Sequence, residues 1–327
     1  MKPELAICAL LFAACSHAAA AQPAPAAQYP SRAVRIVVPF PPGGGTDIIS
    51  RTVAQRLNEA WGQPVIVDNR AGANGIIGTD MIAKAKPDGY TLGVVIANHA
   101  INPSLYPKLP YDTMRDFMPV TLMAQYPYIL TVHPSVPAKS VREFIALAKA
   151  RPGQLAYASS GNGSGPHLGM ELFKSMAKID VVHVPYKGAA PANTDLIAGE
   201  VQAMFNNFLA AMPFITSQRL RVLAVTTERR SQAMRELPTI AESGLPGFDV
   251  KSYYAMIAPA GTPAAVVNKI QADIAAALRV PAVHARLTAE GAEPVGSTSE
   301  QLGKLLQAEI EKWGRVVREA KVKPESF

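Results

Sequence analysis

The residues of this chain best suited to hold a ligand lie in a glycine-rich loop, residues 43–47, with the sequence Gly-Gly-Gly-Thr-Asp. A β-branched run, Val34–Val38, precedes the loop, and an amphipathic helical pattern follows it. A strand, a loop of glycines and a helix N-terminus leave backbone N–H groups uncovered, and such groups bind the oxygens of an anion. The pattern predicts an oxyanion site, with Thr46 or Asp47 as the helix N-cap. A tight strand–helix turn without a ligand is the alternative.

A second loop of the same kind spans residues 157–167, where serines, glycines, a proline and a histidine follow an apolar run. Pro166 suits the first helical position, with Ser164 or Gly165 as the cap. A serine hydrolase is the catalytic alternative, in which His167 would activate one of three serines: Ser159, Ser160 or Ser164. None of them stands in a G-x-S-x-G motif, and a triad also needs an orienting carboxylate. We therefore expect a binding loop.

Other predicted strand ends also carry polar side chains without a surplus of charge. Asparagines, hydroxyls and loop amides accept and donate hydrogen bonds, which suits a binding protein better than a catalyst. The predicted ligand-binding residues are Phe40, Pro42, Gly43, Gly44, Gly45, Thr46, Asp47, Asn74, Gly75, Asn98, Ser159, Ser160, Gly161, Ser164, His167, Tyr186, Lys187, Asp195 and Asn206. Asp195 lies in the first turn of a predicted helix, where a role in complementing the helix dipole is the favoured alternative, and a lone His99 is more typical of a structural histidine.

Metal and cofactor chemistry has little support. None of the six histidines pairs with another four residues away, and both cysteines, Cys8 and Cys15, lie in or at the edge of a predicted signal sequence. No pair of carboxylates is placed for acid–base chemistry. We predict no catalytic residue, no metal and no cofactor.

The composition limits the class of protein. A chain of 327 residues with 49% hydrophobic and 17% charged residues is globular, not disordered. Its net charge of +7 is spread over scattered basic residues, without basic runs interleaved with aromatics, so nucleic-acid binding is not expected.

Residues 1–21 read as a secretory signal: Lys2, an apolar run, then a small-residue cleavage region. Residues 22–28 read as a flexible leader. Acylation of Cys15, as in a lipoprotein, is the less favoured alternative. We expect a periplasmic protein.

Short apolar runs alternate with helical patterns, which indicates an α/β fold with mostly parallel strands. Two extended apolar segments ending in proline, residues 126–134 and 253–263, look like crossings between two lobes. They predict a discontinuous domain, residues 29–128 and 254–327, around an inserted domain, residues 129–253. Helix caps are expected at Ser140 and Thr262, and the last long helix is expected to start near Thr298.

Several motifs together resemble the Bug family, the extracytoplasmic solute receptors of tripartite tricarboxylate transporters. They include YPSR at residues 29–32, IVVPF at 36–40, GGGTD at 43–47, DNRAGA at 68–73, KPDGYTL at 86–92, VPYKG at 184–188 and APAGTP at 258–263. The resemblance covers roughly residues 29–325. It implies a two-lobed periplasmic-binding fold of type II that closes over a small carboxylate, held by loop amides, hydroxyls and water.

The resemblance implies capture of a small organic carboxylate and its delivery to cognate membrane permease subunits. Two other functions stay open: the secreted serine hydrolase described above, and a sensory receptor that presents its liganded form to a signalling partner. The identity of the carboxylate does not follow from the sequence.

Overall fold

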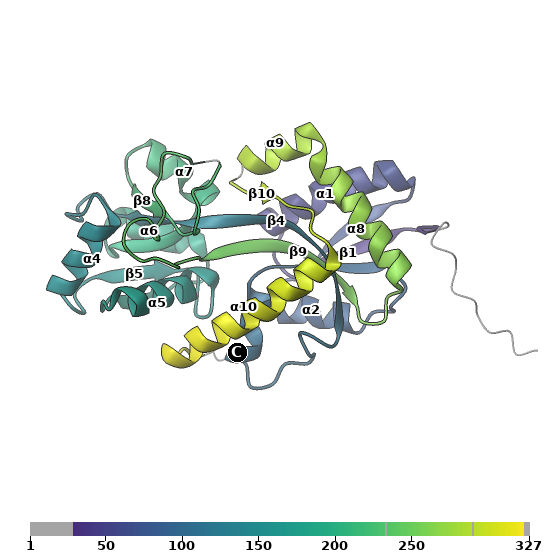
Figure 1. Cartoon of the computed structure of the whole chain (residues 1–327), viewed down its shortest axis with the longest axis horizontal. Coiled ribbons are helices and arrows are strands. Elements are labelled where there is room, and N and C mark those ends of the chain that lie inside the picture. The colour runs from purple at the N-terminus through teal and green to yellow at the C-terminus, as the bar shows by residue number, and fades with distance from the viewer. Residues whose placement is uncertain (1–28, 233, 290, 324–327) are drawn as a thin grey trace, which may run out of the picture.

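The computed structural model describes residues 29–323, apart from Ala233 and Glu290, and shows two α/β lobes joined by two long strands (Figure 1). The predicted signal peptide, leader and Cys15 lie outside the described residues. Within residues 29–323, every helix is too short or too polar to cross a membrane.

The first lobe is built from both ends of the described chain. Its N-terminal elements are β1 (Val34–Val38), α1 (Gly45–Trp61), β2 (Val65–Asn69), the short 3-10 helix η2 (Ala73–Gly75), α2 (Ile76–Ala83), β3 (Thr91–Val95) and α3 (Asn98–Leu105). Its C-terminal elements are α8 (Ala264–Arg279), α9 (Pro281–Ala289), β10 (Glu293–Pro294) and α10 (Ser299–Glu319). β2, β1 and β3 are parallel neighbours.

The second lobe is formed by the middle of the chain. Its elements are α4 (Val141–Ala150), β5 (Ala156–Ser159), α5 (Gly165–Ala177), β6 (Val182–Pro185), α6 (Ala189–Ala198), β7 (Ala203–Asn207), α7 (Phe208–Thr216) and β8 (Arg221–Val225). Here β6, β5 and β7 are parallel neighbours.

The crossing strands are β4 (Phe117–Val132) and β9 (Lys251–Pro259). β4 pairs with β9 from Phe117 to Pro127, then with β7 from Tyr128 and with β8 from Ile129. All of these pairings are antiparallel, so the prediction of mostly parallel strands was wrong for the centre of the sheet. The chain enters the second lobe along β4 and returns along β9, and the two strands therefore run in opposite directions.

The first half of β4 was not predicted as a strand. Two prolines, Pro119 and Pro127, interrupt its apolar run, and proline is unusual inside a sheet. The pairing with β9 shifts register next to Pro119 and again between Leu122 and Ala124. These bulges absorb the irregular sequence, so one strand of 16 residues spans both lobes.

The predicted helix starts agree with the structure at two positions. Ser140 caps α4, and Thr298 caps α10 in a complete capping box with Gln301. Two other predictions were wrong. The N-cap of α1 is Gly44, which places Thr46 and Asp47 inside the first turn, and the N-cap of α8 is Pro263, because the hydroxyl of Thr262 donates to the carbonyl of Pro259 instead (2.7 Å).

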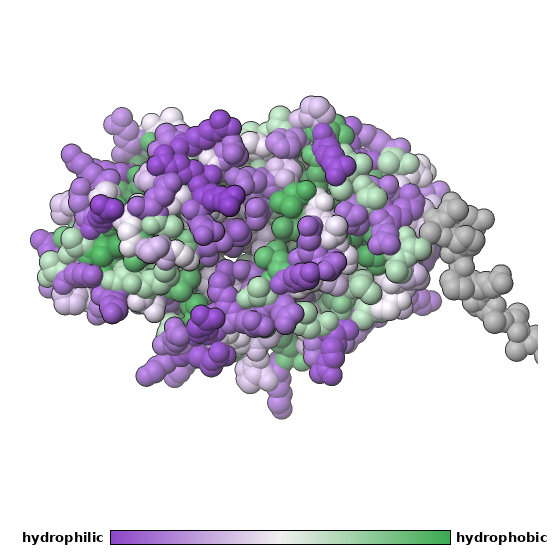
Figure 2. Space-filling view, viewed as in Figure 1, coloured by the Kyte–Doolittle hydropathy of each residue, from purple (hydrophilic) through white to green (hydrophobic). Residues whose placement is uncertain are grey.

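The apolar stripe of α10 belongs to the core. Leu302, Leu306 and Trp313 are buried, and the helix packs on α3 and β4 and reaches α5 of the second lobe. In Figure 1 it lies across the junction of the lobes. Figure 2 shows that this face of the molecule is mainly hydrophilic, with hydrophobic residues in small separate groups.

His99 lies in the core of the first lobe, as expected for a structural histidine. Its ring stacks on Tyr111 (centroids 6.2 Å apart) and meets the edge of Phe117 (5.1 Å). Burial lowers the pKa of His99 to about 4 from an ordinary value of 6.5. The imidazole is therefore neutral in the folded protein at physiological pH.

Acidification should destabilise the protein through His99. Between pH 6.5 and about 4 the unfolded chain binds a proton at this histidine and the folded chain does not, so the free energy of unfolding should fall by up to about 3 kcal/mol in this window. Above pH 6.5 His99 should contribute no pH dependence. Urea unfolding of the wild type and His99→Phe at neutral and acidic pH measures the difference. Equal losses in both proteins would contradict the assignment, because the other histidines are common to both.

Candidate ligand-binding site

The loop after β1 presents its amides at the carboxyl end of the parallel strands, where ligands bind in sheets of this kind. Gly43 and Gly44 are exposed, and Gly44 begins α1 by accepting the amides of Asp47 (2.9 Å) and Ile48 (3.0 Å). The amides of Gly45 and Thr46 belong to the first turn, whose N–H groups have no partner inside a helix. This loop can therefore bind an anion through its backbone.

The Asp47 carboxylate stabilises the same loop by accepting hydrogen bonds inside it. Its Oδ2 accepts the amide of Gly43 (3.0 Å) and Nε of Arg51 (3.0 Å). Burial alone would raise the pKa of Asp47, but these bonds from Arg51 and Gly43 outweigh burial and hold the pKa below its ordinary value. Asp47 is thus an internal carboxylate of the loop, and Gly43 has already used its amide.

Asn74 and Asn98, both predicted from the sequence, meet in the first lobe. The side-chain amide of Asn98 donates to Oδ1 of Asn74, and that of Asn74 donates to Oδ1 of Asn102 (2.9 Å). Asn74 has a left-handed backbone (φ 53°), a conformation that asparagine tolerates. Beside it, the ring of Phe40 lies 3.3 Å from where a side chain on Gly75 would begin. Asn102 was not predicted.

The loop after β5 is held by its own side chains. The hydroxyl of Ser164 donates to the carbonyl of Gly161 (2.7 Å) and caps α5 by accepting the amide of His167. Nδ1 of His167 accepts the amide of Gly163 (3.0 Å). Ser164 is the predicted cap, and Pro166 takes the second helical position instead of the first.

Ser159 pairs with a histidine that sequence reasoning missed. Its Oγ lies 2.7 Å from Nε2 of His183, because β5 and β6 are neighbours and set Tyr157 opposite His183. His183 also stacks on His167 (centroids 3.8 Å apart).

These groups are poorly suited to a hydrolase. Ser159 is fully buried. Burial lowers the pKa of His167 to about 4 and that of His183 to about 3, so neither is a strong base. Nδ1 of His167 accepts the amide of Gly163, so this ring nitrogen is not available as a base for a loop serine.

The remaining predicted residues of the second lobe follow β5 and β6 or lie in α6 and β7. Tyr186 donates its hydroxyl to Oδ2 of Asp195 (2.6 Å), and burial together with this bond raises the pKa of Tyr186 to about 12. Lys187 is exposed and Ser160 half-buried. Asn206 is fully buried and donates to Asn193 inside the lobe.

The loop after β5 lies against the first lobe. A side chain on Gly163 would begin 2.1 Å from Cδ1 of Leu105, at the end of α3, so the second loop touches the first lobe. The printed hydrogen bonds of each predicted group are made within its own lobe, and the second loop meets the first lobe at the end of α3. Groups of acidic, histidine and cysteine side chains that could hold a metal do not occur in residues 29–323.

Three tyrosines of the crossing strands lie between the loops and were not predicted as site residues. The Tyr126 ring is 4.9 Å from that of Tyr254 and 5.9 Å from that of Tyr128. The hydroxyl of Tyr254 lies against Gly45, and that of Tyr128 lies against Gly165. Tyr254 belongs to a tyrosine pair visible in the sequence, but the contacts with the helices have no local signal.

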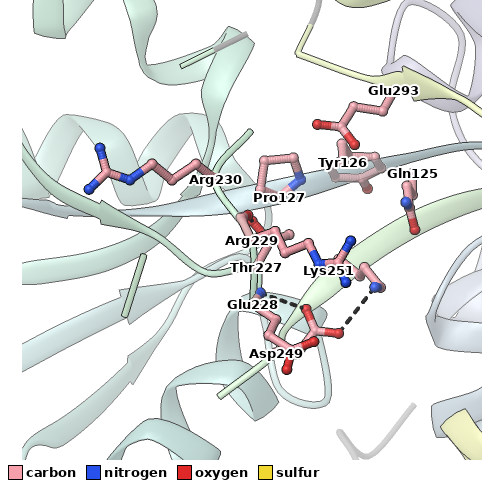
Figure 3. A pocket seen from close by; sticks show the side chains of 10 residues that line it. All are labelled: Gln125, Tyr126, Pro127, Thr227, Glu228, Arg229, Arg230, Asp249, Lys251 and Glu293. Carbon is pink, nitrogen blue, oxygen red and sulfur yellow. Dashed lines mark hydrogen bonds and ion pairs between the residues drawn. The ribbon is translucent and has the colours of Figure 1, made fainter. Parts of the chain in front are cut away.

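A cavity of about 440 Å³ lies beside the crossing strands and is lined by both lobes (Figure 3). Its charged residues are Glu228, Arg229, Arg230, Asp249, Lys251 and Glu293. Most of these charges are engaged: Lys251 pairs with Asp249 (3.1 Å), Arg230 with Glu242 (3.0 Å), and Glu293 accepts the amide of Gln232 (3.2 Å). The lining includes none of the residues predicted from the sequence.

Comparison with known proteins shows what the chain is similar to. Residues 49–322 match the family model described as the tripartite tricarboxylate transporter family receptor. The protein BugT of Bordetella pertussis is 40% identical over 93% of this chain and 94% of its own length.

Two solved structures are similar in sequence and fold. The R. palustris protein Rpa4515, solved with adipate, has a TM-score of 0.81 and 39% identity, covering 91% of this chain and 100% of that chain. MatC from Rhodopseudomonas palustris, solved with malate, has a TM-score of 0.76 and 33% identity, covering 88% of this chain and 100% of that chain.

Replacing Gly45 by alanine should destabilise the protein. The new methyl group would begin 2.1 Å from the hydroxyl oxygen of Tyr254, a buried side chain that is packed on Tyr126. Overpacking of this kind costs about 1–3 kcal/mol. Removing the hydroxyl in the double variant Gly45→Ala/Tyr254→Phe should restore most of the loss, as measured by urea unfolding.

Gly303→Ala is the matched control, because its methyl group would meet only Pro119, at 3.7 Å, in the interior of α10. It should be neutral or stabilise by up to about 1 kcal/mol. A double variant as unstable as Gly45→Ala alone would show that the contact with the Tyr254 hydroxyl is not the cause.

Proposed function

The chain belongs to the tripartite tricarboxylate transporter receptor family, and on that premise we propose that it captures a small organic carboxylate between its lobes and delivers it to the membrane permease subunits of such a transporter. The proposal places the protein in the periplasm, after removal of residues 1–21. It places the hinge where the chain changes lobe, with domains at residues 29–128 and 254–327 and at residues 129–253. Closure is a hinge motion of the kind that binding proteins use around a ligand.

The observation that carries the proposal is the first turn of α1. The turn follows the exposed Gly44, the N–H groups of Gly45 and Thr46 have no partner inside the helix, and Gly45 lies against Tyr254 of the crossing strand β9. Carboxylate oxygens bind such donors without a charged partner. The similar proteins solved with adipate and malate hold organic carboxylates, which supports the same class of ligand here.

The secreted hydrolase is disfavoured by the same geometry. Its serine would be the fully buried Ser159, and its base would be a histidine with a pKa of about 3. A carboxylate ligand needs neither group to be accessible.

A panel of mono-, di- and tricarboxylates should include ligands that raise the melting temperature of the purified chain lacking residues 1–28. Stabilisation follows from binding to the folded state alone. Calorimetry then gives the affinity of the best ligand. If every carboxylate in the panel leaves the melting temperature unchanged, the proposed function is wrong.

Thr46→Val should weaken the best ligand by about tenfold or more, because a hydrogen bond to a charged group contributes about 1.5–3 kcal/mol. Valine keeps the shape of threonine, so the melting temperature without ligand should change little. Arg229→Ala, in the cavity of Figure 3, is the control and should leave the affinity unchanged. A loss of affinity in Arg229→Ala, with unchanged affinity in Thr46→Val, would show that the ligand binds in that cavity and not at the α1 loop.

A further inference from the structure

The loop between β1 and α1, which carries the proposed ligand donors, has few backbone groups that could hold it in place. Most of it is exposed, and three of its residues have no N–H group to donate: Pro39, Pro41 and Pro42. Keeping such a loop in one shape costs conformational entropy, which contacts from outside the loop must offset. The structure provides these contacts at two points, the carbonyl of Phe40 and the amide of Gly43.

Asn69 holds the first of these points. It is the last residue of β2 and lies opposite Val38, the last residue of β1. Two residues beyond Val38, the carbonyl of Phe40 accepts a hydrogen bond from the side-chain amide of Asn69 (3.1 Å). The end of one strand therefore fixes the neighbouring chain at the point where that chain leaves the sheet.

Arg51 of α1 connects the first point to the second. Its Nη2 donates to Oδ1 of Asn69 (3.1 Å), and its Nε donates to Oδ2 of Asp47 (3.0 Å). The same carboxylate oxygen accepts the amide of Gly43 (3.0 Å). A guanidinium group has several donors in a fixed plane, so one arginine can make both bonds at once. The three side chains form a continuous chain of hydrogen bonds from the Phe40 carbonyl to the Gly43 amide.

We infer that Asn69 and Arg51 are positioning residues for ligand binding, and that they act through the loop rather than through contact with the ligand. The inference rests on the proposed function. By fixing the loop at both points, they keep the amides of Gly45 and Thr46 in the arrangement that receives the carboxylate. Arg51 has a second effect, because its charge offsets that of Asp47, which would otherwise repel an anion at the same helix end.

Amide hydrogen exchange, followed by NMR on the ligand-free chain lacking residues 1–28, tests the hydrogen-bond chain directly. Asn69→Ala and Arg51→Ala should each speed exchange of the Gly43 amide by about tenfold or more, because its carboxylate acceptor is no longer held in place. Exchange of the amides in β3 should not change. Arg56→Ala is the matched control: Arg56 lies on the same helix but pairs with Glu59 (2.8 Å) instead of with the loop. It should leave the Gly43 amide unchanged.

Calorimetry with the best carboxylate of the panel measures the consequence for binding. Asn69→Ala and Arg51→Ala should weaken this ligand about tenfold or more, and Arg56→Ala should leave its affinity unchanged. The melting temperature of Arg51→Ala without ligand should stay close to that of the wild type, since the Arg51 side chain is 54% exposed. Arg51→Lys keeps the charge but cannot bridge two acceptors in the same way, so it should restore only part of the affinity.

Unchanged exchange of the Gly43 amide in both alanine variants would overturn the inference and leave the proposed function standing. A lower melting temperature with unchanged affinity would overturn it too, because that is the result of a purely structural role. Failure of every carboxylate to bind the wild type would overturn the proposed function and, with it, the role of both residues in ligand binding.

Discussion

The antiparallel pairing of β4 with β9 is the interaction on which the rest of the molecule depends. This ribbon contributes to the sheets of both lobes, and each lobe's parallel strands are added to it from one side: β3 pairs with β9, and β7 pairs with β4. The ribbon fixes the position of these parallel strands, and the predicted ligand loops follow the strands directly. The ribbon therefore determines where the loops of each lobe lie. In the proposed closure the ribbon keeps its hydrogen bonds, and the lobes rotate about the ends of the shared segment.

The same ribbon also determines which residue type can begin α1 and α5. α1 and α5 each begin with a glycine against a tyrosine hydroxyl, so neither position accepts a side chain. These glycines are needed for close approach rather than for backbone conformation, since neither has a positive φ, whereas Gly43 (φ 84°) and Gly163 (φ 71°) are needed to turn the chain. A glycine-rich loop here thus meets two separate requirements, turning and contact, at different positions.

Sequence reasoning predicted what depends on local pattern. β1 has the predicted bounds, Ser140 caps its helix, the last long helix starts next to Thr298, and the two-lobed α/β fold follows from the alternation of elements and the two crossings. It did not predict contacts set by distant pairing. His167 was considered as the partner of a loop serine because it is near in sequence, yet His183 is the partner of Ser159 because β6 lies beside β5. The tyrosine hydroxyls were missed because Tyr254 lies more than 200 residues after Gly45.

Asp47 changes how the first glycine loop should be understood. A bare loop at a helix N-terminus would bind an anion with the full benefit of the helix dipole. Here a buried carboxylate already occupies one amide, and its charge is only partly offset by Arg51, whose side chain is 54% exposed and therefore screened by solvent. In the proposed function a ligand carboxylate shares the helix end with this internal charge and is bound less tightly than it would be by the loop alone. Weaker binding suits a receptor that must release its ligand to a transporter. Release also leaves no unpaired buried charge behind, because the uncharged donors are hydrated again in the empty cleft.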